Sequence, residues 1–504
     1  MHFPSRIAVR TTNSLYAHAF NRSVRTSSKT LNVGISNTSP KLLQEIPGPT
    51  RYPVLGTAVD LLKSGGPTKY VDNYKKNFKL YGPIYREFVP GIPGRIMVNV
   101  AHPEAVEKVY RSEGPHPERV GFDLFEVYFR EKKIRPFGIQ LQGEEWFNSR
   151  QKLAPKMMMP KAVEQSMEDF NDVANDAMKR MKALRPANGH FPNIEDEVFR
   201  YSMESVALYA IGVRIGLFSD NADEKIFKFM NAGKMFFDQL ANLLFSFPAY
   251  RYISTPTWKK FRSSLDTIRS IGRTFVDSRL AELKNSPGEK GPSLLDYLLD
   301  KNLDPDEISI ACIFQLLGGV DTTGYSIVWV MYHLAKNPEA QEQLYEELNT
   351  VLKGEEPYPK ALSQLPFLKA CVKESQRLCP LATLIPRVLK KDVELLGYHI
   401  PKNTWINVHN YGMACSEQFF KEPEKYIPQR WLRETGDKIN PYSFLPFGHG
   451  PRQCIGRRVA ELEMYIYIIK LLQTFKLEHH GETGMIFKVG IYPEKRMNFQ
   501  IEER

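Results

Sequence analysis

Residues 447–456 read FGHGPRQCIG, and no other segment of the chain constrains its structure as tightly. The glycines permit a tight loop whose backbone N–H groups can point at a sulfur atom. Hydrogen bonds of that kind, together with the N-terminus of a following helix, would stabilise the thiolate of Cys454 and tune a metal bound to it. We therefore predict that Cys454 is a metal ligand. The alternative is a buried free thiol beside a turn.

This loop resembles the cysteine loop of the cytochrome P-450 family of haem-thiolate monooxygenases, and the resemblance extends from about Ile46 to the C-terminus. It implies heme b (iron protoporphyrin IX) as the cofactor, with Cys454 as the iron ligand, Phe447 beside the haem and Arg452 at a propionate. It also implies one large domain over residues 45–504, mainly α with a smaller β portion (α+β). In that fold the haem lies between a long central helix and the cysteine loop. The positions that carry the resemblance are Phe447, Gly448, Gly450, Arg452, Cys454 and Gly456.

A glutamate and an arginine three positions apart, Glu374 and Arg377, resemble the Glu-x-x-Arg motif of this family. At that spacing the two side chains share one face of a helix and can form an ion pair. The resemblance implies that Arg430, in the segment YIPQRW, completes a buried structural group that holds the haem loop. Taken alone the pattern is weak, since surface helices carry many such pairs as solvated ion pairs.

The segment Gly318–Thr323 (GGVDTT) lies midway along a long apolar stretch. Two glycines inside a helix cost stability, and here they would let the helix bend and dioxygen approach its backbone. Asp321 and Thr322 form a pair able to deliver protons, the hydroxyl donating to dioxygen and the acid connecting it to water. We predict catalytic roles for both. The alternative is a kinked core helix with capped polar groups.

Further residues resemble the propionate-binding groups of the family. Trp146 and Arg150 lie four positions apart, so both donors face one way on a helix and can reach a propionate. Arg387, in the segment IPRVLKKD, resembles the family's arginine before a β turn. For each of these residues the alternative is a surface ion pair.

The pattern along the chain predicts one mainly helical domain. Helical signals dominate from about 145 to 380 and return after Gly456. Short β patterns lie at 76–100 and 385–410. Asp304 is placed to cap the long apolar helix that contains the glycine pair.

Residues 1–44 resemble a mitochondrial transit peptide, since they are basic, rich in Ser and Thr, and contain no acidic residue before Glu45. Apolar residues are interspersed with basic ones, whereas a secretory signal has an unbroken apolar core. The alternative is a disordered basic tail without an address. The basic residues of this leader are Arg6, Arg10, Arg22, Arg25, Lys29 and Lys41.

The net charge of +11 does not indicate nucleic-acid binding, because more than half of the excess lies in the leader. The five cysteines are sparse and unclustered, which suits a reducing compartment and gives no Cys-x-x-Cys pair for zinc. No apolar run reaches the ~18 residues of a membrane span, so we expect at most peripheral contact with a membrane.

Lys369 and Lys373 lie four positions apart, on a helix face offset by about 100° from that of the Glu-x-x-Arg pair. In mitochondrial members of the family, lysines at these positions dock an acidic ferredoxin. The resemblance therefore implies an adrenodoxin-like 2Fe-2S ferredoxin as partner, with Arg457 and Arg458 enlarging the basic surface that steers it. The alternative is a pair of ordinary solvated lysines.

An apolar stretch around residues 235–252 resembles the family's roof over the haem, which in mitochondrial members also touches the inner membrane. A second candidate wall lies within residues 115–130. Both suit a lipophilic small molecule of the sterol, steroid, secosteroid or xenobiotic class, and the alternative is plain helix core. The candidates are Phe122, Leu124, Phe125, Met235, Phe236, Phe237, Leu243, Leu244, Phe245, Phe247, Pro248, Tyr250 and Tyr252.

The leading interpretation is a mitochondrial monooxygenase on the matrix side of the inner membrane. Electrons from NADPH reach it through ferredoxin reductase and the ferredoxin, and one atom of dioxygen is inserted into a C–H bond of the substrate. One alternative is a haem-thiolate isomerase or dehydratase without a redox partner, against which Asp321, Thr322 and the lysine pair argue. The other is a non-enzymatic haem sensor or carrier, which would have no use for Thr322.

Overall fold

The structure is a computed structural model that describes residues 39–504 except 93, 122, 245, 287–289 and 436–437. The chain divides into two units, Met1–Pro40 and Lys41–Arg504. The predicted transit peptide lies outside the described residues as far as residue 38, so it stays a prediction, as does the domain boundary at residue 45. Lys41 is already part of the second unit, where its N–H donates to the carbonyl oxygen of Gly397 at 2.9 Å.

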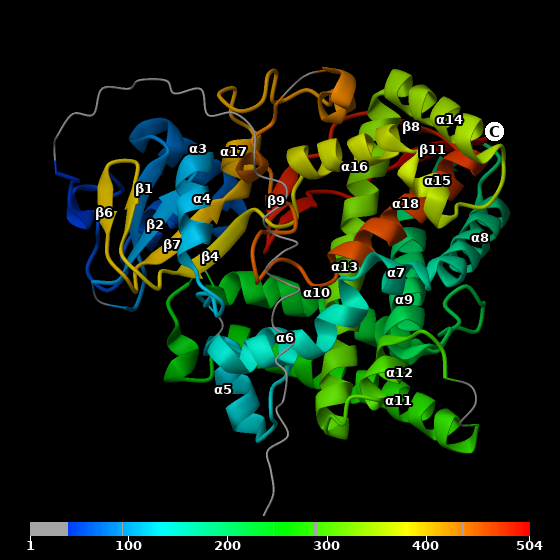
Figure 1. The fold of residues 1–504 in the computed structure, drawn as a ribbon, viewed down its shortest axis with the longest axis horizontal. Helices are drawn as coiled ribbons and strands as arrows, with labels where there is room; N and C mark the ends of the chain where they lie inside the picture. The colour runs from blue at the N-terminus through cyan, green and yellow to red at the C-terminus, as the bar shows by residue number, and fades with distance from the viewer. Residues whose placement is uncertain (1–38, 93, 122, 245, 287–289, 436–437) are drawn as a thin grey trace, which may run out of the picture. The chain divides into compact units, whose positions relative to one another are not determined.

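Helices make up most of the second unit (Figure 1). None of the helices in the described ranges is long and apolar enough to cross a membrane. The helices are α2 (Ala58–Lys63), α3 (Tyr70–Tyr81), α4 (Pro103–Ser112), α5 (Asp123–Lys132), α6 (Gly143–Met157), α7 (Pro160–Glu164), α8 (Met167–Leu184), α9 (Ile194–Ile211), α10 (Glu224–Leu244), α11 (Pro256–Asn285), α12 (Leu294–Leu299), α13 (Pro305–Lys336), α14 (Pro338–Leu352), α15 (Pro359–Ser363), α16 (Pro366–Leu378), α17 (Asn410–Ala414) and α18 (Arg457–Thr474).

The strands are short and, within the described residues, the largest sheet has the order β1-β2-β7-β4. Its β2 and β7 pair in parallel and its other neighbours pair antiparallel, with Ile84 opposite Val100 and Ile385 opposite Val408. The strands are β1 (Ile84–Phe88), β2 (Ile96–Val100), β3 (His190–Phe191), β4 (Leu384–Val388), β5 (Val393–Leu395), β6 (Tyr398–Ile400), β7 (Trp405–His409), β8 (Phe475–His479), β9 (Met485–Phe487), β10 (Ile491–Pro493) and β11 (Phe499–Glu503).

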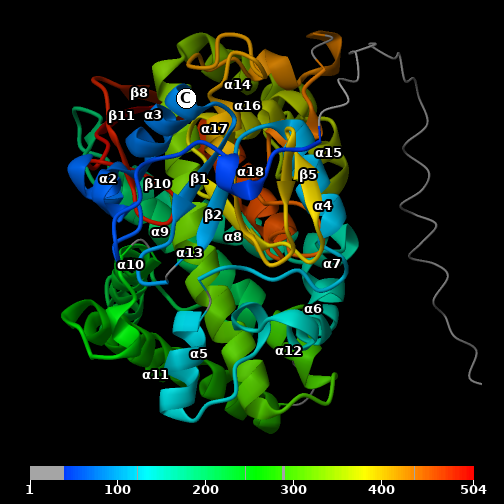
Figure 2. The ribbon, with the colours of Figure 1, turned by 90° about the vertical axis from the view of Figure 1, so that its left-hand side faces the viewer.

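The longest helix, α13, runs through the middle of the helical part (Figures 1 and 2). The Asp304 side chain accepts a hydrogen bond from the N–H of Asp306 at 2.8 Å, and Pro305 occupies the first helical position. Both features fix the start of the helix. Apolar side chains surround α13, so it is buried against α9, α11, α16 and α18.

Two hydrophobic cores meet at the cysteine loop. The smaller core lies against the main sheet and includes Val98, Ile406 and, just before the loop, Leu445. The larger core lies among the helices and includes Val459, just after the loop. Residues 446–458 therefore bridge the two cores, so both ends of the cysteine loop are held by packing.

The sequence patterns predicted most of this arrangement. Asp304 caps the long helix as expected, and helix returns after Gly456 as α18. The β patterns at 76–100 and 385–410 contain β1, β2 and the strands from β4 to β7, with β4 beginning one residue earlier, at Leu384. The predicted β pattern is wrong for residues 76–81, which form the end of α3. The predicted class, mainly α with a smaller β portion, is confirmed.

Candidate active site

Two glycines shape the cysteine loop. Gly448 and Gly450 have φ values of 71° and 73°, a left-handed conformation that favours glycine. The N–H of Cys454 donates to the carbonyl oxygen of Phe447 at 2.8 Å and closes the loop. Gly456 is the N-cap residue of α18, so the cysteine sits one turn before a helix N-terminus.

The Cys454 side chain is exposed, although protein atoms surround it. Burial raises the pKa of the Cys454 thiol, whereas the backbone N–H of Gly456 and the guanidinium groups of Arg119, Arg150 and Arg457 act to lower it. Cys454 has accessible surface although protein atoms surround it, so its sulfur faces a hollow inside the protein. A metal ion bound there would deprotonate the thiol.

One face of α13 borders the same hollow. Gly318 is exposed and Gln315 and Thr322 are half-buried, although the rest of the helix is mostly buried. Positions three and four apart lie on one helix face. A Cβ atom at Gly318 would meet no atom within 4 Å, and a Cβ atom at Gly456 would lie 3.5 Å from Nε2 of Gln315. The open face of α13 is therefore next to the cysteine loop, where the resemblance expects the haem.

Two of the three glycines of α13, Gly319 and Gly324, lie against α9, whereas Gly318 lies on the open face. A Cβ atom at Gly319 would lie 2.8 Å from a methyl group of Val206, and one at Gly324 would lie 2.6 Å from the ring of Phe199. Both neighbours belong to α9, so Gly319 and Gly324 allow the two helices to pack closely. The predicted bend is not needed to explain Gly319, since its glycine is required by contact with α9.

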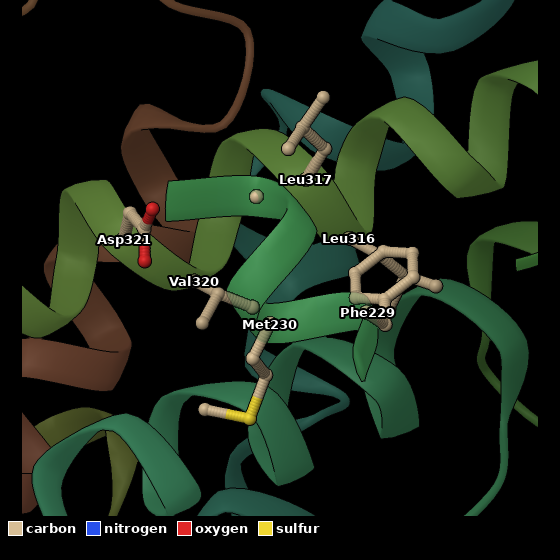
Figure 3. A pocket seen from close by; sticks show the side chains of 7 residues that line it. Phe229, Met230, Leu316, Leu317, Val320 and Asp321 are labelled. Carbon is tan, nitrogen blue, oxygen red and sulfur yellow. The ribbon is translucent and has the colours of Figure 1, made fainter. Parts of the chain in front are cut away.

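Asp321 faces away from the hollow, toward α10. Its carboxylate would lie 4.0 Å from a Cβ atom at Gly233, and it borders an otherwise apolar cavity of about 10 Å³ (Figure 3). A cavity of that size holds about one water molecule. Burial raises the pKa of Asp321 to about 6, while Lys234 and Lys488 act to lower it.

Thr322 lies on the open face, where its hydroxyl donates to the carbonyl oxygen of Gly318 at 2.6 Å. Successive residues of a helix are about 100° apart, so Asp321 and Thr322 point to different neighbours. Among the described residues no hydrogen bond joins the two side chains. The predicted pair is adjacent in sequence but not in direct contact.

Arg387 and Arg452 are buried, each 1% exposed. Arg387 forms an ion pair with Glu113, and Arg452 donates to the carbonyl oxygen of Pro117 at 2.5 Å and to Oε1 of Gln142 at 2.7 Å. Nη2 of Arg387 and Nη1 of Arg452 have no partner among the described residues. A buried N–H group without a partner costs free energy, so both positions favour an anionic ligand.

Arg119 and Arg150 add two more cations to this group. Nη2 of Arg119 donates to the carbonyl oxygen of Arg452 at 2.7 Å. Burial, together with neighbouring guanidinium groups, lowers the pKa of Arg119 to about 10 and that of Arg452 to about 9. Burial also lowers the pKa of Arg150 to about 10. This excess of positive charge beside Cys454 fits the two propionate carboxylates of heme b.

Trp146 supports two of these arginines through its ring. The guanidinium carbon of Arg452 lies 4.0 Å from the ring centroid and that of Arg150 lies 5.6 Å from it. The ring is 4% exposed, so both cation–π contacts are shielded from water. Phe447 plays a similar part on the other side of the loop, with the guanidinium carbon of Arg457 5.6 Å from its ring.

Four residues of the site were not predicted from the sequence: Glu113, Arg119, Gln142 and Gln315. Glu113 and Arg119 belong to the segment EGPHPER, whose glycine and prolines indicate a loop but not what the loop contacts. Gln142 and Gln315 are single polar residues without a motif. Gln315 gave the one available signal, because a polar residue on an apolar helix requires a hydrogen-bond partner or an open space beside it.

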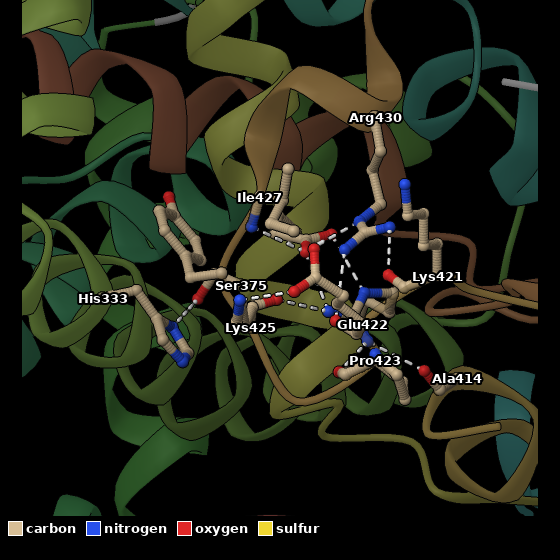
Figure 4. Close-up of polar contacts among 12 residues, drawn as sticks. His333, Ser375, Ala414, Lys421, Glu422, Pro423, Lys425, Ile427 and Arg430 are labelled. Carbon is tan, nitrogen blue, oxygen red and sulfur yellow. Dashed lines mark hydrogen bonds and ion pairs between the residues drawn. The ribbon is translucent and has the colours of Figure 1, made fainter. Parts of the chain in front are cut away.

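The Glu-x-x-Arg pair forms a buried group with Arg430 (Figure 4). Glu374 and Arg377 are 0% exposed and are joined by two hydrogen bonds of 2.9 and 2.8 Å. Arg430 Nε and Trp431 Nε1 donate to the same carboxylate at 3.0 and 2.8 Å. Burial acts to raise the pKa of Glu374, but Arg377 and Arg430 hold it below its usual value. The group fastens the segment before the cysteine loop to α16.

The predicted docking residues lie together on the surface next to the cysteine loop; we call Lys369, Lys373, Arg457 and Arg458 the basic patch. Lys369 is half-buried and Lys373 is exposed. Burial and Lys373 lower the pKa of Lys369, and burial and Arg457 lower that of Lys373, which places the cations within electrostatic reach. Glu461 pairs with Arg457 at 2.9 Å and with Arg458 at 3.5 Å.

The structure divides the predicted roof residues into buried and exposed ones. Phe125 and Phe236 are 7% and 3% exposed, and their ring centroids lie 6.2 Å apart in the helical core. Phe247 and Tyr252 are 38% and 75% exposed. Two of the candidates, Phe122 and Phe245, lie outside the described residues.

Known proteins resemble the chain over nearly its whole length. The Cytochrome P450 family profile matches residues 46–497. Cytochrome P450 10 of Lymnaea stagnalis is 31% identical over 504 aligned positions, which cover 96% of this chain and 90% of that protein. The mitochondrial 1,25-dihydroxyvitamin D(3) 24-hydroxylase of Rattus norvegicus is 31% identical, covering 86% of this chain and 83% of that protein.

A third relative is the mitochondrial cholesterol side-chain cleavage enzyme of Mesocricetus auratus. It is 31% identical, and the alignment covers 93% of this chain and 91% of that enzyme. The profile match and these relatives agree with the cysteine loop, the arginine cluster and the buried Glu374 group described above. The chain therefore belongs to the cytochrome P450 family and is a haem-thiolate monooxygenase that carries heme b.

Proposed function

We propose that this cytochrome P450 inserts one atom of dioxygen into a lipophilic substrate of the sterol, steroid, secosteroid or xenobiotic class. The observation that carries the proposal is the hollow between Cys454 and the open face of α13, next to buried arginines with unpartnered N–H groups. Relatives named for a secosteroid and a sterol support the substrate class. Their named activities, hydroxylation and side-chain cleavage, do not favour an isomerase, a dehydratase or a haem sensor.

The residues next to the hollow divide into those that hold the haem and those that move protons. Heme b supplies the activation of dioxygen when it is bound. Cys454 holds the iron through its thiolate, and Arg150, Arg387 and Arg452 hold the propionates. Arg119 positions Arg452 through the hydrogen bond to its carbonyl oxygen.

Proton delivery falls to Asp321 and Thr322. With a pKa of about 6, Asp321 is able to take up and release protons near neutral pH. Thr322 presents its hydroxyl on the open face, so a water molecule or a rotation of Asp321 has to connect the two. The small cavity beside Asp321 gives room for either event.

Electrons come from NADPH through ferredoxin reductase and an adrenodoxin-like 2Fe-2S ferredoxin that docks on the basic patch. Glu461 already neutralises part of the charge of Arg457 and Arg458, whereas no ion pair joins Lys369 or Lys373 to a carboxylate within the described ranges. The two lysines are therefore the cations most available to an acidic partner. Relatives that are mitochondrial by name support a mitochondrial location, where such ferredoxins act.

On the matrix side of the inner membrane, an apolar surface would give the protein its peripheral contact. Val54, Phe247, Tyr252 and Ile253 are exposed, at 70%, 38%, 75% and 65%. A Cβ atom at Gly91 would lie 2.8 Å from the Phe247 ring, and the N–H of Gly91 donates to the carbonyl oxygen of Val54. Val54 and Phe247 therefore lie close together, and Tyr252 and Ile253 follow Phe247 by five and six positions, as an apolar contact with lipid requires.

The test is a screen of sterols, steroids, secosteroids and xenobiotics by the spin-state shift of the haem in the purified holoenzyme. Compounds that shift the spectrum are then incubated with NADPH, ferredoxin reductase and ferredoxin. We expect oxygen consumption and an oxygenated product that both depend on the ferredoxin. Conversion of a ligand without ferredoxin, or binding without oxygen consumption, would contradict the proposal.

A further inference from the structure

A second cavity, of about 580 Å³, lies between the end of α5, the middle of α11 and the start of α13. α5 and α11 appear together at the lower end of Figure 2. They are joined there by a hydrogen bond of 2.9 Å from the Tyr128 hydroxyl to Asp266. Pockets for drug-sized ligands have volumes of about 300–1,000 Å³, so this cavity has room for one.

This cavity is separate from the candidate active site. About 20 Å of helix separates Ser309, which lines the cavity, from Thr322 on the open face. Ser309 and Gly318 are also about 180° apart around the helix axis, as are Ile313 and Thr322. The cavity therefore lies on the opposite side of α13 from the hollow beside Cys454.

Every carboxylate of the cavity is already engaged. Three form ion pairs and the fourth caps α13, so none of them is available to bind a ligand cation. The partners are Arg273 for Asp306, Arg135 for Glu307 at 3.3 Å, Lys132 for Asp266 at 2.7 Å, and the N–H of Asp306 for Asp304 at 2.8 Å.

The remaining polar groups of the cavity are two cations, the exposed Ser270 hydroxyl and the buried Ser309 hydroxyl. No ion pair joins Lys133 or Arg269 to a carboxylate in the described part of the chain, although Nη1 of Arg269 lies 3.4 Å from the Tyr128 hydroxyl. Ser309 is 2% exposed, and its hydroxyl has no hydrogen-bond partner among the described residues. A buried hydroxyl left unpaired costs free energy, which a ligand acceptor would remove.

The wall formed by α13 is apolar. Ile310 and Ile313 line the cavity and are 4% and 2% exposed. Ile134 lines it from the segment after α5. The cavity thus combines two cations that form no ion pair among the described residues, a buried hydroxyl donor and an apolar wall.

We propose that this cavity binds an amphipathic organic anion, meaning a compact apolar body that carries a single sulfonate, sulfate or carboxylate group. Lys133 and Arg269 attract the anionic group, and the Ser309 hydroxyl donates a hydrogen bond to it. The apolar body lies against Ile310 and Ile313. The site is independent of the haem and of the substrate hollow.

The test uses anilinonaphthalene sulfonate as the probe and the uncharged phenylnaphthylamine as its match, both titrated by fluorescence into the holoenzyme. We expect Arg269→Glu to raise the Kd of the sulfonate by at least about tenfold and Ser309→Ala to raise it by about threefold. Lys259→Glu makes the same charge change elsewhere on α11 and should alter the Kd by less than about twofold. Neither Arg269→Glu nor Ser309→Ala should change the Kd of the uncharged probe.

Three results would overturn the proposal. One is unchanged sulfonate binding in both Arg269→Glu and Ser309→Ala. Another is an equal loss of affinity for the uncharged probe, which would mean that the variants damaged the fold. The third is displacement of the sulfonate by an azole that ligates the haem iron, which would place the probe in the active site. If Arg269→Glu fails to fold, as judged by its carbon monoxide spectrum, Ser309→Ala alone decides.

Discussion

Asp321 and Thr322 are neighbours in α13, yet the Asp321 carboxylate lies against Gly233 of α10 while the Thr322 hydroxyl lies on the open face with Gly318. A proton that reaches Asp321 therefore arrives on one side of the helix and has to leave on another. The water-sized cavity beside Asp321 is the place in the structure where such a transfer has room.

Replacing Asp321 with asparagine should slow turnover by about 100-fold or more, since positioned acid–base groups contribute about 10²–10⁴. The same change should stabilise the fold at neutral pH. Burial raises the pKa of Asp321 from 3.8 to about 6, so the folded protein loses stability as the pH rises from about 4 to about 6. That loss amounts to about 3 kcal/mol, and asparagine removes it.

Denaturant unfolding of the wild type and Asp321→Asn across this pH range measures the stability difference, and product formation measures turnover. Asp238→Asn is a matched control, because Asp238 lies nearby but pairs with Lys488 at 2.8 Å. Equal pH profiles for the wild type and Asp321→Asn would show that Asp321 carries no proton.

Replacing Cys454 with serine should abolish the thiolate-type carbon monoxide spectrum of the reduced protein, because a serine hydroxyl does not supply thiolate ligation. Cys415→Ser is the matched control, since Cys415 is distant from the cysteine loop in sequence and is half-buried. Survival of the spectrum in Cys454→Ser would remove Cys454 from the role of iron ligand.

Changing both Lys369 and Lys373 to glutamate should slow reduction by ferredoxin at least about tenfold at low salt, because the basic patch would then repel an acidic partner. Stopped-flow reduction with an adrenodoxin-type ferredoxin measures the rate. Lys259→Glu with Lys260→Glu makes the same change of charge on α11. If this control slows reduction as much as the test variant does, net charge explains the effect and docking does not.

Replacing Glu374 with glutamine should cost about 3–5 kcal/mol of stability, since it leaves Arg377 and Arg430 as buried cations without their carboxylate. Because Arg377 and Arg430 hold the pKa of Glu374 below 4.5, the wild type should lose this contribution as the pH falls below about 4.5, and the variant should not. Denaturant unfolding and haem content measure the effect.

The exposed pair between Glu104 and Lys108, 3.2 Å apart, provides the comparison. Glu104→Gln should cost less than about 0.5 kcal/mol. A similar small cost for Glu374→Gln would mean that the buried group does not hold the cysteine loop.

The two central glycines of α13 should respond differently to alanine. Gly319→Ala should destabilise the protein by about 1–3 kcal/mol, because the new methyl group would lie 2.8 Å from Val206. A Cβ atom at Gly318 would meet no protein atom within 4 Å, so Gly318→Ala should gain up to about 1 kcal/mol from helix propensity in the haem-free protein. Thermal unfolding compares the two variants, and equal effects would contradict the packing argument.

Much of the fold follows from local sequence signals. Asp304 and Pro305 mark a helix start by capping chemistry, and the strands at residues 84–100 follow from short apolar runs separated by Pro90 and Gly91. Such signals are local, so a single sequence reveals them. The Glu374–Arg377 pair was equally accessible, because its spacing alone places both side chains on one helix face.

The rest depends on contacts between distant segments. Arg119 and Gln142 reach Arg452 from more than 300 positions away, and no periodic pattern encodes such a meeting. The different directions of the Asp321 and Thr322 side chains were also not predicted, although the 100° step between successive helix residues implies them. Phe236 appeared as a roof residue in the sequence and is core in the structure, since apolar residues serve both purposes.

The close fit of Gly319 and Gly324 against Val206 and Phe199 bears on how this enzyme can be altered. A library that seeks a new substrate range has to leave these four positions unchanged, because a side chain at either glycine would meet Val206 or Phe199 at under 3 Å and push α13 and α9 apart. Useful diversity belongs on the other elements that approach α13, such as α5 and α10. Variation there changes the shape of the substrate space, while Thr322 on α13 and the cysteine loop keep their positions.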